Sequence, residues 1–200
     1  MDTENVTPAR TVLDESLAAL GRVVAALRED DGGRPTPCAA WNVTQVVQHA
    51  AGDQIGWAAT VGGGPFPTWD PFAPSGHLDV TPSALVTEAL DRSRAAWATV
   101  AGDAAEVPTP LPMGAMPAPL AAAACAMDAA VHAWDLAVAT GQESPLTPEL
   151  ARGLLPAAEA VADPLRGFAF EAALPAQPGD GDVETLLRHL GRNPAWRPTP

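Results

Sequence analysis

Apolar residues recur with the spacing of an amphipathic helix in four long stretches of this chain. These stretches cover about residues 8–29, 42–61, 81–102 and 119–140. Each begins at a threonine, asparagine or proline and ends close to a glycine, as helices commonly do. Helices of about 20 residues, each with one apolar face, predict a four-helix bundle.

The segments between and after these helices have less regular patterns. Residues 62–80 and 107–119 are too rich in proline and glycine for regular structure, and long loops of this kind often border a functional site. A fifth amphipathic helix is expected over residues 148–162, followed by an irregular or short-strand segment and a short last helix. The pattern therefore predicts an all-α protein, with a four-helix-bundle domain over residues 1–162 and a small C-terminal appendage packed on it over residues 163–200.

The fourth predicted helix carries a row of polar side chains among small apolar ones. Asp128, His132 and Asp135 follow the i, i+4, i+7 spacing that puts residues on one face of a helix, and Cys125 extends the row by one turn. The residues between them are Ala, Val, Met or Trp, so the row is expected to face other protein rather than water. A buried carboxylate normally pairs with a cation, binds a metal or takes up a proton.

Two interpretations of this row are open. An Asp followed four residues later by a His can hold one metal ion, as in zinc sites on helices. The same pair can be a hydrogen-bonded couple in a core that binds nothing, which on spacing alone is the more frequent case. His49 is a candidate third ligand, because it lies at the edge of the apolar stripe of its helix on the same side as Asp53. A lone histidine at such a position can equally be satisfied by a neighbouring group or by water.

The charge balance narrows the range of partners. Eleven arginines, no lysine and 24 acidic residues give a formal net charge of -13, which is the wrong sign for binding nucleic acid or an anionic membrane. The N-terminus lacks the pattern of a secretory signal, and the longest apolar run is shorter than the roughly 18 residues of a membrane span. We expect a cytoplasmic protein with two free thiols that binds a small-molecule substrate, with no nucleic acid and no membrane as partners. A homodimer is also possible as the assembly state.

Four motifs carry a resemblance to a known family. The segment "TPCAAWNVTQVVQHAAG" resembles the TPC-x-x-W-x-V-x-x-x-x-x-H signature of the mycothiol-dependent maleylpyruvate isomerase-like proteins, which belong to the DinB-like superfamily of metal-binding four-helix bundles. "MGAMPAP" is similar to the family's G-x-M-P-G loop, and "DAAVHAWDLAVATGQ" to its E-x-x-x-H-x-W-D-L-A-x-A-T-G-Q helix. "LLRHLGRNPAW" is similar to its C-terminal motif. The four motifs follow the family's order and span residues 36–196.

The resemblance implies a divalent metal, usually zinc, held by a histidine of the second helix and a Glu-x-x-x-His pair of the fourth. The corresponding residues here are His49, Asp128 and His132. The chain departs from the family at Asp128, which stands where the family has glutamate and whose side chain reaches about 1.5 Å less far. Either the helices approach more closely here, or the metal site is weakened.

Three protein ligands leave one coordination position open, as in catalytic zinc sites. The resemblance implies that the thiol of mycothiol, as cosubstrate, takes this position as a thiolate and attacks a small electrophilic molecule in a transfer or an isomerisation reaction. Asp135 would then orient an imidazole, and Asp53 could do the same for His49. Asp135 can equally serve helix packing.

The two cysteines are expected to have structural roles. Cys125 lies one turn from Asp128, whose charge would raise rather than lower the pKa of a thiol, and Cys38 lies outside the first turn of its helix. Structural roles are also expected for the remaining candidates: Trp41, Trp57 and Trp134 with Cys125 as walls of the core or pocket, and His77 and His189 at the surface.

The competing hypothesis is a metal-free DinB-like bundle. Such a protein would keep the scaffold and use its cavity to bind a small molecule or to catalyse thiol-independent chemistry. The shorter side chain of Asp128 motivates this alternative. Neither hypothesis assigns a catalytic residue to the chain itself.

Overall fold

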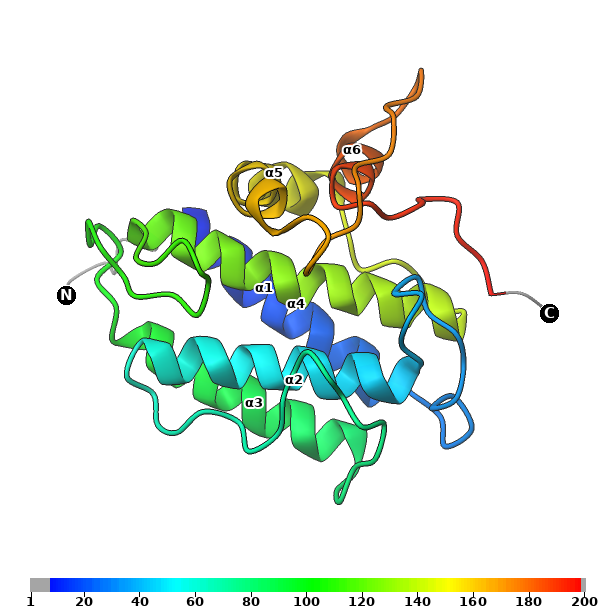
Figure 1. Cartoon of the computed structure of the whole chain (residues 1–200), viewed down its shortest axis with the longest axis horizontal. Coiled ribbons are helices and arrows are strands. Elements are labelled where there is room, and N and C mark those ends of the chain that lie inside the picture. Colours follow the sequence, from blue (N-terminus) through cyan, green and yellow to red (C-terminus); the bar gives the residue numbers. More distant parts are fainter. Residues whose placement is uncertain (1–7, 199–200) are drawn as a thin grey trace.

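The computed structural model describes residues 8–198 and contains six α-helices in that range (Figure 1). The helices are α1 (Pro8–Ala25), α2 (Val43–Thr60), α3 (Pro82–Ala98), α4 (Ala118–Thr140), α5 (Pro148–Ala162) and α6 (Asp182–His189), with a single 3-10 turn, η1 (Asp163–Leu165), after α5. The described part of the chain forms isolated β-bridges but no strand. The predicted all-α class is therefore confirmed.

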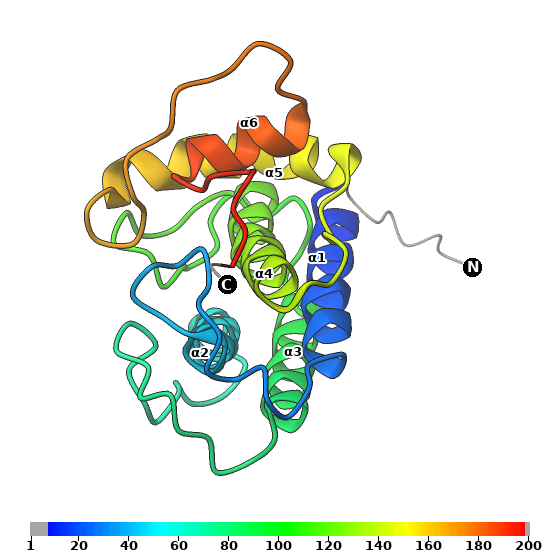
Figure 2. The same cartoon turned by 90° about the vertical axis from the view of Figure 1, so that its right-hand side faces the viewer.

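The first four helices form the predicted four-helix bundle. Helices α1 and α2 each pack on both α3 and α4, which is the arrangement that Figure 2 shows nearly end-on along α2 and α4. Leucine and valine side chains of α1 and α2 fill the space between the four helices together with the alanines of α4. The prediction of a four-helix bundle is confirmed for the described residues.

Local sequence signals set the ends of the two helices that carry the candidate ligands. At the start of α2 the Asn42 side chain accepts a hydrogen bond from the backbone N–H of Gln45, and the Gln45 side chain accepts one from the backbone of Asn42, each at 3.0 Å. This is a capping box. Helix α4 ends at Gly141, whose φ of 73° lies in the left-handed region that favours glycine.

The apolar pattern predicted that the first helix ends near Glu29. In the structure α1 ends at Ala25, so this endpoint was wrong. The buried carboxylate of Asp31 accepts a hydrogen bond from the backbone N–H of Arg28 at 2.8 Å and pairs with the Arg34 side chain at 3.2 Å. These contacts fold residues 28–34 into turns. A carboxylate that takes up the N–H needed to continue a helix leaves no trace in helical periodicity.

Helix α4 is the central helix of the protein. It contacts α1, α2 and α5, and nearly all of its side chains are buried. Its alanines allow the neighbouring helices to approach closely. By length and composition alone α4 could cross a membrane, but 89% of its most apolar window is buried inside the protein, as in the core helix of a soluble protein.

Helices α5 and α6 form a layer on one side of the bundle (Figure 1). Helix α5 packs on α1 and α4, and α6 packs on α5. The boundary at residues 162 and 163 between a bundle domain and an appendage stays a prediction, and the outermost residues 1–7 and 199–200 of these two units lie outside the described part.

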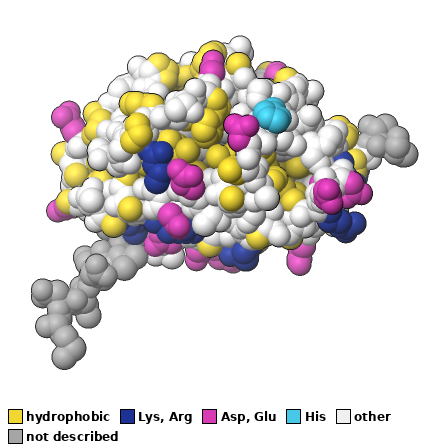
Figure 3. Space-filling model, turned by 90° about the horizontal axis from the view of Figure 1, so that it is seen from below, with side chains coloured by type: hydrophobic (Ala, Val, Ile, Leu, Met, Phe, Trp, Pro, Cys, Tyr) yellow, Lys and Arg dark blue, Asp and Glu magenta, His cyan; other side chains and the backbone are white. Residues whose placement is uncertain are grey.

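Few large apolar side chains reach the surface of the described residues. Phe66, Phe72, Val80 and Phe168 are the exposed ones. On the face that Figure 3 shows, apolar surface lies between scattered acidic and arginine side chains.

Candidate metal centre

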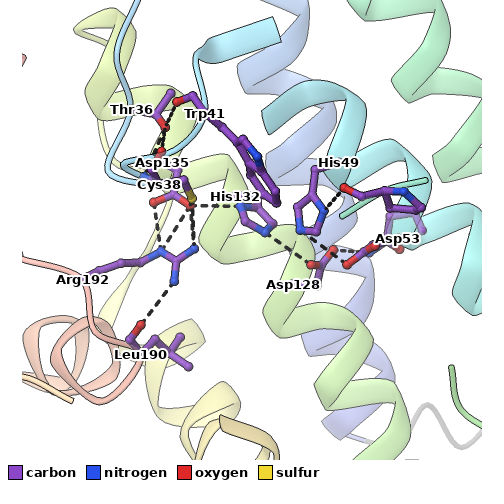
Figure 4. A network of polar contacts seen from close by, with 12 residues as sticks. Thr36, Cys38, Trp41, His49, Asp53, Asp128, His132, Asp135, Leu190 and Arg192 are labelled. Carbon is purple, nitrogen blue, oxygen red and sulfur yellow. Dashed lines mark hydrogen bonds and ion pairs between the residues drawn. The ribbon is translucent and has the colours of Figure 1, made fainter. Parts of the chain in front are cut away.

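Two buried histidines from different helices face each other between α2 and α4. The ring centroids of His49 and His132 are 4.7 Å apart, and the rings are almost perpendicular (Figure 4). Each imidazole is less than one tenth exposed. The edge position predicted for His49 on its helix thus brings it to the row of polar residues on α4.

Both imidazoles are held through the same ring nitrogen. His49 Nδ1 lies 2.8 Å from the carbonyl oxygen of Pro71, and His132 Nδ1 lies 3.0 Å from Oδ2 of Asp135. Since a carbonyl and an ionised carboxylate can only accept, each Nδ1 carries a proton, and Nε2 is the ring nitrogen of each histidine that could bind a metal. Burial also lowers the pKa of His49 and so favours its neutral form. Neutral imidazoles with a free Nε2 and an engaged Nδ1 are the usual form of histidine metal ligands.

The Pro71 carbonyl comes from the loop between α2 and α3. This loop lies across α2, where the Trp69 indole N–H donates to the backbone oxygen of Gln48 at 3.3 Å. The approach is close because residue 52 is glycine: a Cβ there would lie 2.8 Å from Pro71 Cγ. The loop that sequence predicted to border a site therefore fixes the orientation of His49.

Asp128 supplies an oxygen beside these nitrogens. Its Oδ1 lies 3.5 Å from His132 Nε2, and the potential ligand atoms of His49, Asp128 and His132 all lie within 4.8 Å of one another. A tetrahedral zinc ion with bonds of about 2.0–2.1 Å separates its ligand atoms by about 3.4 Å. The pair from α4 already has nearly that separation, so these three residues fit a zinc ion after a small movement of His49.

A second carboxylate lies next to this set. Asp53 Oδ2 is 3.6 Å from His49 Nε2. Burial raises the pKa of Asp53 to about 7, while burial and then the neighbouring Asp53 charge raise that of Asp128 to about 6. Two partly buried carboxylates and two imidazoles close together are a donor set that suits a divalent cation.

Gln54 holds Asp128 in place. Its amide Nε2 donates to Asp128 Oδ2 at 3.2 Å, and its Oε1 accepts hydrogen bonds from the hydroxyl of Ser93 at 3.0 Å and the thiol of Cys125 at 3.3 Å. Gln54 is completely buried. The amide therefore has a fixed orientation, which leaves Asp128 Oδ1 free to face the histidines.

Asp135 lies on the far side of His132 and is completely buried. It receives the His132 Nδ1 proton and pairs with the guanidinium of Arg192, whose Nη2 is 2.9 Å from its Oδ2 (Figure 4). Desolvation alone would raise the pKa of Asp135, but the Arg192 charge and the hydrogen bonds from His132 and Arg192 together outweigh it, so the pKa lies well below its usual range. Asp135 is therefore ionised.

Cys38, expected to be a packing residue, also contacts this group. Its Sγ lies 3.2 Å from Asp135 Oδ2, and burial followed by the Asp135 charge raises the pKa of the thiol far above its usual value. Thr36 shapes the turn that carries Cys38 through a hydrogen bond from its hydroxyl to the Trp41 carbonyl at 2.8 Å. Cys38, His132 and Asp135 are spaced for a metal ion, but the Arg192 cation already occupies the position beside two of them.

The other sequence candidates lie in the core or at the surface. Cys125 is fully buried and burial raises its pKa to about 12, so it is a protonated thiol. Trp57 packs against Trp97 with ring centroids 6.1 Å apart, and Trp134 is buried within α4. The remaining two are His77, which is exposed beside Asp79, and His189, whose Nε2 lies 3.3 Å from the Ala158 carbonyl.

Sequence reasoning gave no role to Gln54, Arg192 or Phe72. Phe72 meets the edge of the His49 ring at a centroid distance of 5.6 Å. Arg192 belongs to the quoted C-terminal motif, which could have signalled a contact with the site. Neither Gln54 nor Phe72 has a sequence signal, because their roles depend on which helix and loop lie beside them.

A helical bundle with a His/Asp/His ligand set at the contact of two helices defines a class of candidate metalloproteins. Residues 13–137 match the model of the mycothiol maleylpyruvate isomerase N-terminal domain family. The chain belongs to this family, as its motifs predicted.

The chain also has relatives of known sequence and of known structure. The chain is 34% identical over 182 residues to proteins from two strains of Mycobacterium tuberculosis, covering 87% of this chain and 92% of theirs; both are called uncharacterized. It resembles crystal structures of the mycothiol-dependent maleylpyruvate isomerase and of a single-site mutant of it. Their TM-scores are 0.55 and 0.56 at 21% and 18% identity, over 90% of this chain and 85% of those chains. At these identities the likeness shows the fold alone.

Proposed function

We propose that this protein is a zinc-dependent enzyme that activates a low-molecular-weight thiol such as mycothiol for attack on a small electrophilic organic molecule, in a transfer or an isomerisation reaction. The observation that carries the proposal is that candidate ligand atoms of His49, Asp128 and His132 lie within 4.8 Å of one another, while the Nδ1 atoms of both histidines are engaged. Family membership adds the thiol, because a structural relative is named as mycothiol-dependent.

In this proposal His49, Asp128 and His132 would hold the metal, which would leave a position for the thiol of the cosubstrate. Zinc bound there would lower the pKa of a thiol ligand enough to make it a thiolate at neutral pH. Asp53, whose Oδ2 lies 3.6 Å from His49 Nε2, is a carboxylate outside the three ligands that would be placed to take up the proton the thiol loses. Asp135 keeps the His132 proton on Nδ1.

The aromatic side chains around His49 suggest what the substrate looks like. The Trp41 ring lies 4.5 Å from the imidazole, and the Phe72 ring lies 5.6 Å from it. Phe168 extends this wall by contact with Phe72 at 5.2 Å, although it is 71% exposed. Exposed aromatic rings beside a polar centre are typical of ligand sites. We infer that the substrate carries an apolar or aromatic body next to its electrophilic carbon.

The test is metal content together with a thermal shift on adding zinc and mycothiol. The protein is purified without chelator. We expect it either to contain one equivalent of zinc as purified or to bind one equivalent when zinc is titrated in. His49→Ala and His132→Ala should abolish the shift with zinc, whereas His77→Ala is a matched control with an exposed histidine and should keep it. A wild-type protein that binds no divalent ion, or histidine variants with unchanged shift and activity, would support the metal-free bundle instead.

A further inference from the structure

Arg192 reaches the metal centre from the C-terminal segment. Its Nε lies 3.0 Å from Asp135 Oδ1 and its Nη2 lies 2.9 Å from Oδ2, so the guanidinium grips both carboxylate oxygens. A third contact, from Nη2 to Cys38 Sγ at 3.5 Å, ties it to the turn before α2. A two-point contact fixes direction as well as charge.

The end of α6 directs Arg192 toward the bundle. The Arg192 N–H donates to the Leu187 carbonyl at 2.8 Å and the Gly191 N–H donates to the Arg188 carbonyl at 3.0 Å, which together make a Schellman motif. Gly191 has a φ of 78°, and a Cβ there would lie 2.8 Å from the Cβ of Glu171. Glycine followed by arginine in this motif therefore turns the chain and delivers the guanidinium.

The contacts from Arg192 continue to a candidate ligand. Asp135 accepts the Nδ1 proton of His132 at 3.0 Å, and His132 Nε2 lies 3.5 Å from Asp128 Oδ1. Figure 4 shows Arg192, Asp135 and His132 in one continuous line across α4. The orientation of His132 Nε2 thus depends on an aspartate that is itself held by a residue 57 positions away in the chain.

We propose that Arg192 is a positioning residue which, through Asp135, aims His132 at the metal, so that docking of the C-terminal segment completes the metal centre. This inference rests on the proposed metal function. Groups that orient histidine ligands from behind typically change metal affinity by about 10–100-fold when removed. The C-terminal segment then contributes to the site although none of its residues is a ligand.

The same segment offers a matched control. Arg188 pairs with Asp180 at 2.9 Å, and the Arg188 side chain is as buried as that of Arg192, with 12% exposed in each. Asp180 has no contact with a candidate ligand among the described hydrogen bonds and ion pairs. Arg188→Ala therefore removes an arginine of equal burial from the same segment without touching the line to His132.

The experiment measures zinc affinity by competition with a chromophoric chelator, for the full chain and its Arg192→Ala, Arg192→Lys and Arg188→Ala variants. Arg192→Ala should weaken zinc binding about 10–100-fold. Arg192→Lys keeps the charge but not the two-point contact, so its affinity should lie between those of wild type and Arg192→Ala. Arg188→Ala should stay within about twofold of wild type, even where it lowers thermal stability.

The ligand-field spectrum of the cobalt-loaded proteins supplies a readout that a purely structural role would not move. A displaced His132 should change the band positions in Arg192→Ala and leave them unchanged in Arg188→Ala. Arg192→Lys decides the question if Arg192→Ala does not fold. Wild-type affinity and spectrum in the Arg192 variants, or equal losses in Arg188→Ala, would overturn the inference while the proposed function stands. A wild-type protein that does not bind zinc would overturn both this inference and the proposed function.

Discussion

Replacing Asp128 by asparagine should stabilise the apoprotein and abolish its response to zinc. In the folded protein the Asp128 carboxyl is mostly buried, with 14% exposed, and lies near Asp53. Asparagine has the same shape, can accept the hydrogen bond from Gln54 and can donate one toward the Asp53 carboxylate. Because asparagine carries no charge, the apoprotein should become more stable. Because asparagine is a poor zinc ligand, the stabilisation by zinc should be lost.

The magnitude follows from the pKa of Asp128, which burial raises from 3.8 to about 6. Each tenfold change in an ionisation constant corresponds to about 1.4 kcal/mol. Keeping this carboxyl ionised at pH 7 therefore destabilises the folded apoprotein by about 3 kcal/mol relative to the unfolded chain. For a chain of this length Asp128→Asn should raise the melting temperature by roughly 6–12 °C in the presence of a chelator.

The gain should vanish in acid. Between the ordinary pKa of 3.8 and the raised value of about 6 the folded wild type binds more protons than the unfolded chain, so its stability falls as pH rises through this window. Near pH 4 wild-type Asp128 is protonated in the folded state, and the advantage of asparagine should shrink to below about 1 kcal/mol. The stabilisation is thus a difference between pH 7 and pH 4, not a constant.

Urea unfolding with a chelator at both pH values measures the effect. Asp91→Asn is the control, because Asp91 is 68% exposed and pairs with Arg94 on the surface, so its change should stay within about 0.5 kcal/mol. Zinc at a hundred times its Kd should then stabilise wild type by about 2.7 kcal/mol and the Asp128→Asn variant not at all. An apoprotein that is destabilised by the substitution at pH 7, or stabilised equally at both pH values, would refute the reasoning.

Two further predictions concern the thiols and the aromatic wall. Cys125 and Cys38 should react with iodoacetamide far more slowly in the native protein at pH 8 than after denaturation, because a pKa of about 12 for Cys125 lowers its thiolate fraction on the order of a thousandfold. Mass spectrometry counts the modified cysteines, and rapid labelling of either would contradict the burial argument. In assays with mycothiol, Phe72→Ala should raise the KM for an aromatic electrophile such as chlorodinitrobenzene severalfold and leave kcat nearly unchanged. Phe66→Ala, at another exposed phenylalanine, is the control, and an equal effect there would show that Phe72 contributes no specific contact.

The fold followed from local and periodic information. Helical spacing of apolar residues, the capping box at Asn42 and the glycine at position 141 locate the bundle helices, because these signals act within a few residues of each other. The end of α1 was misplaced because the determining contact comes from Asp31, beyond the helix. The polar row of α4 could also be read directly, since 3.6 residues per turn put Asp128, His132 and Asp135 on one face.

The environment of that row needed the tertiary structure. Sequence alone left open whether the shorter Asp128 could lie close to both histidines. Asp128 and His132 are neighbours on α4, and the packing of α2 on α4 brings the candidate ligand atom of His49 within 4.8 Å of both. The reach of one side chain depends on the distance between two helices, which no residue of either helix specifies by itself.

The sequence by itself determined an all-α bundle, the family and the residue types of a candidate metal site, because these depend on periodicity and on motifs of nearby residues. Only the tertiary structure decided which partners hold those residues: the Pro71 carbonyl behind His49, Gln54 behind Asp128, and Arg192 behind Asp135. Each of these contacts joins a ligand or its support to a residue on a separate element or loop. Their positions follow from the packing of the whole chain, and local sequence cannot encode them.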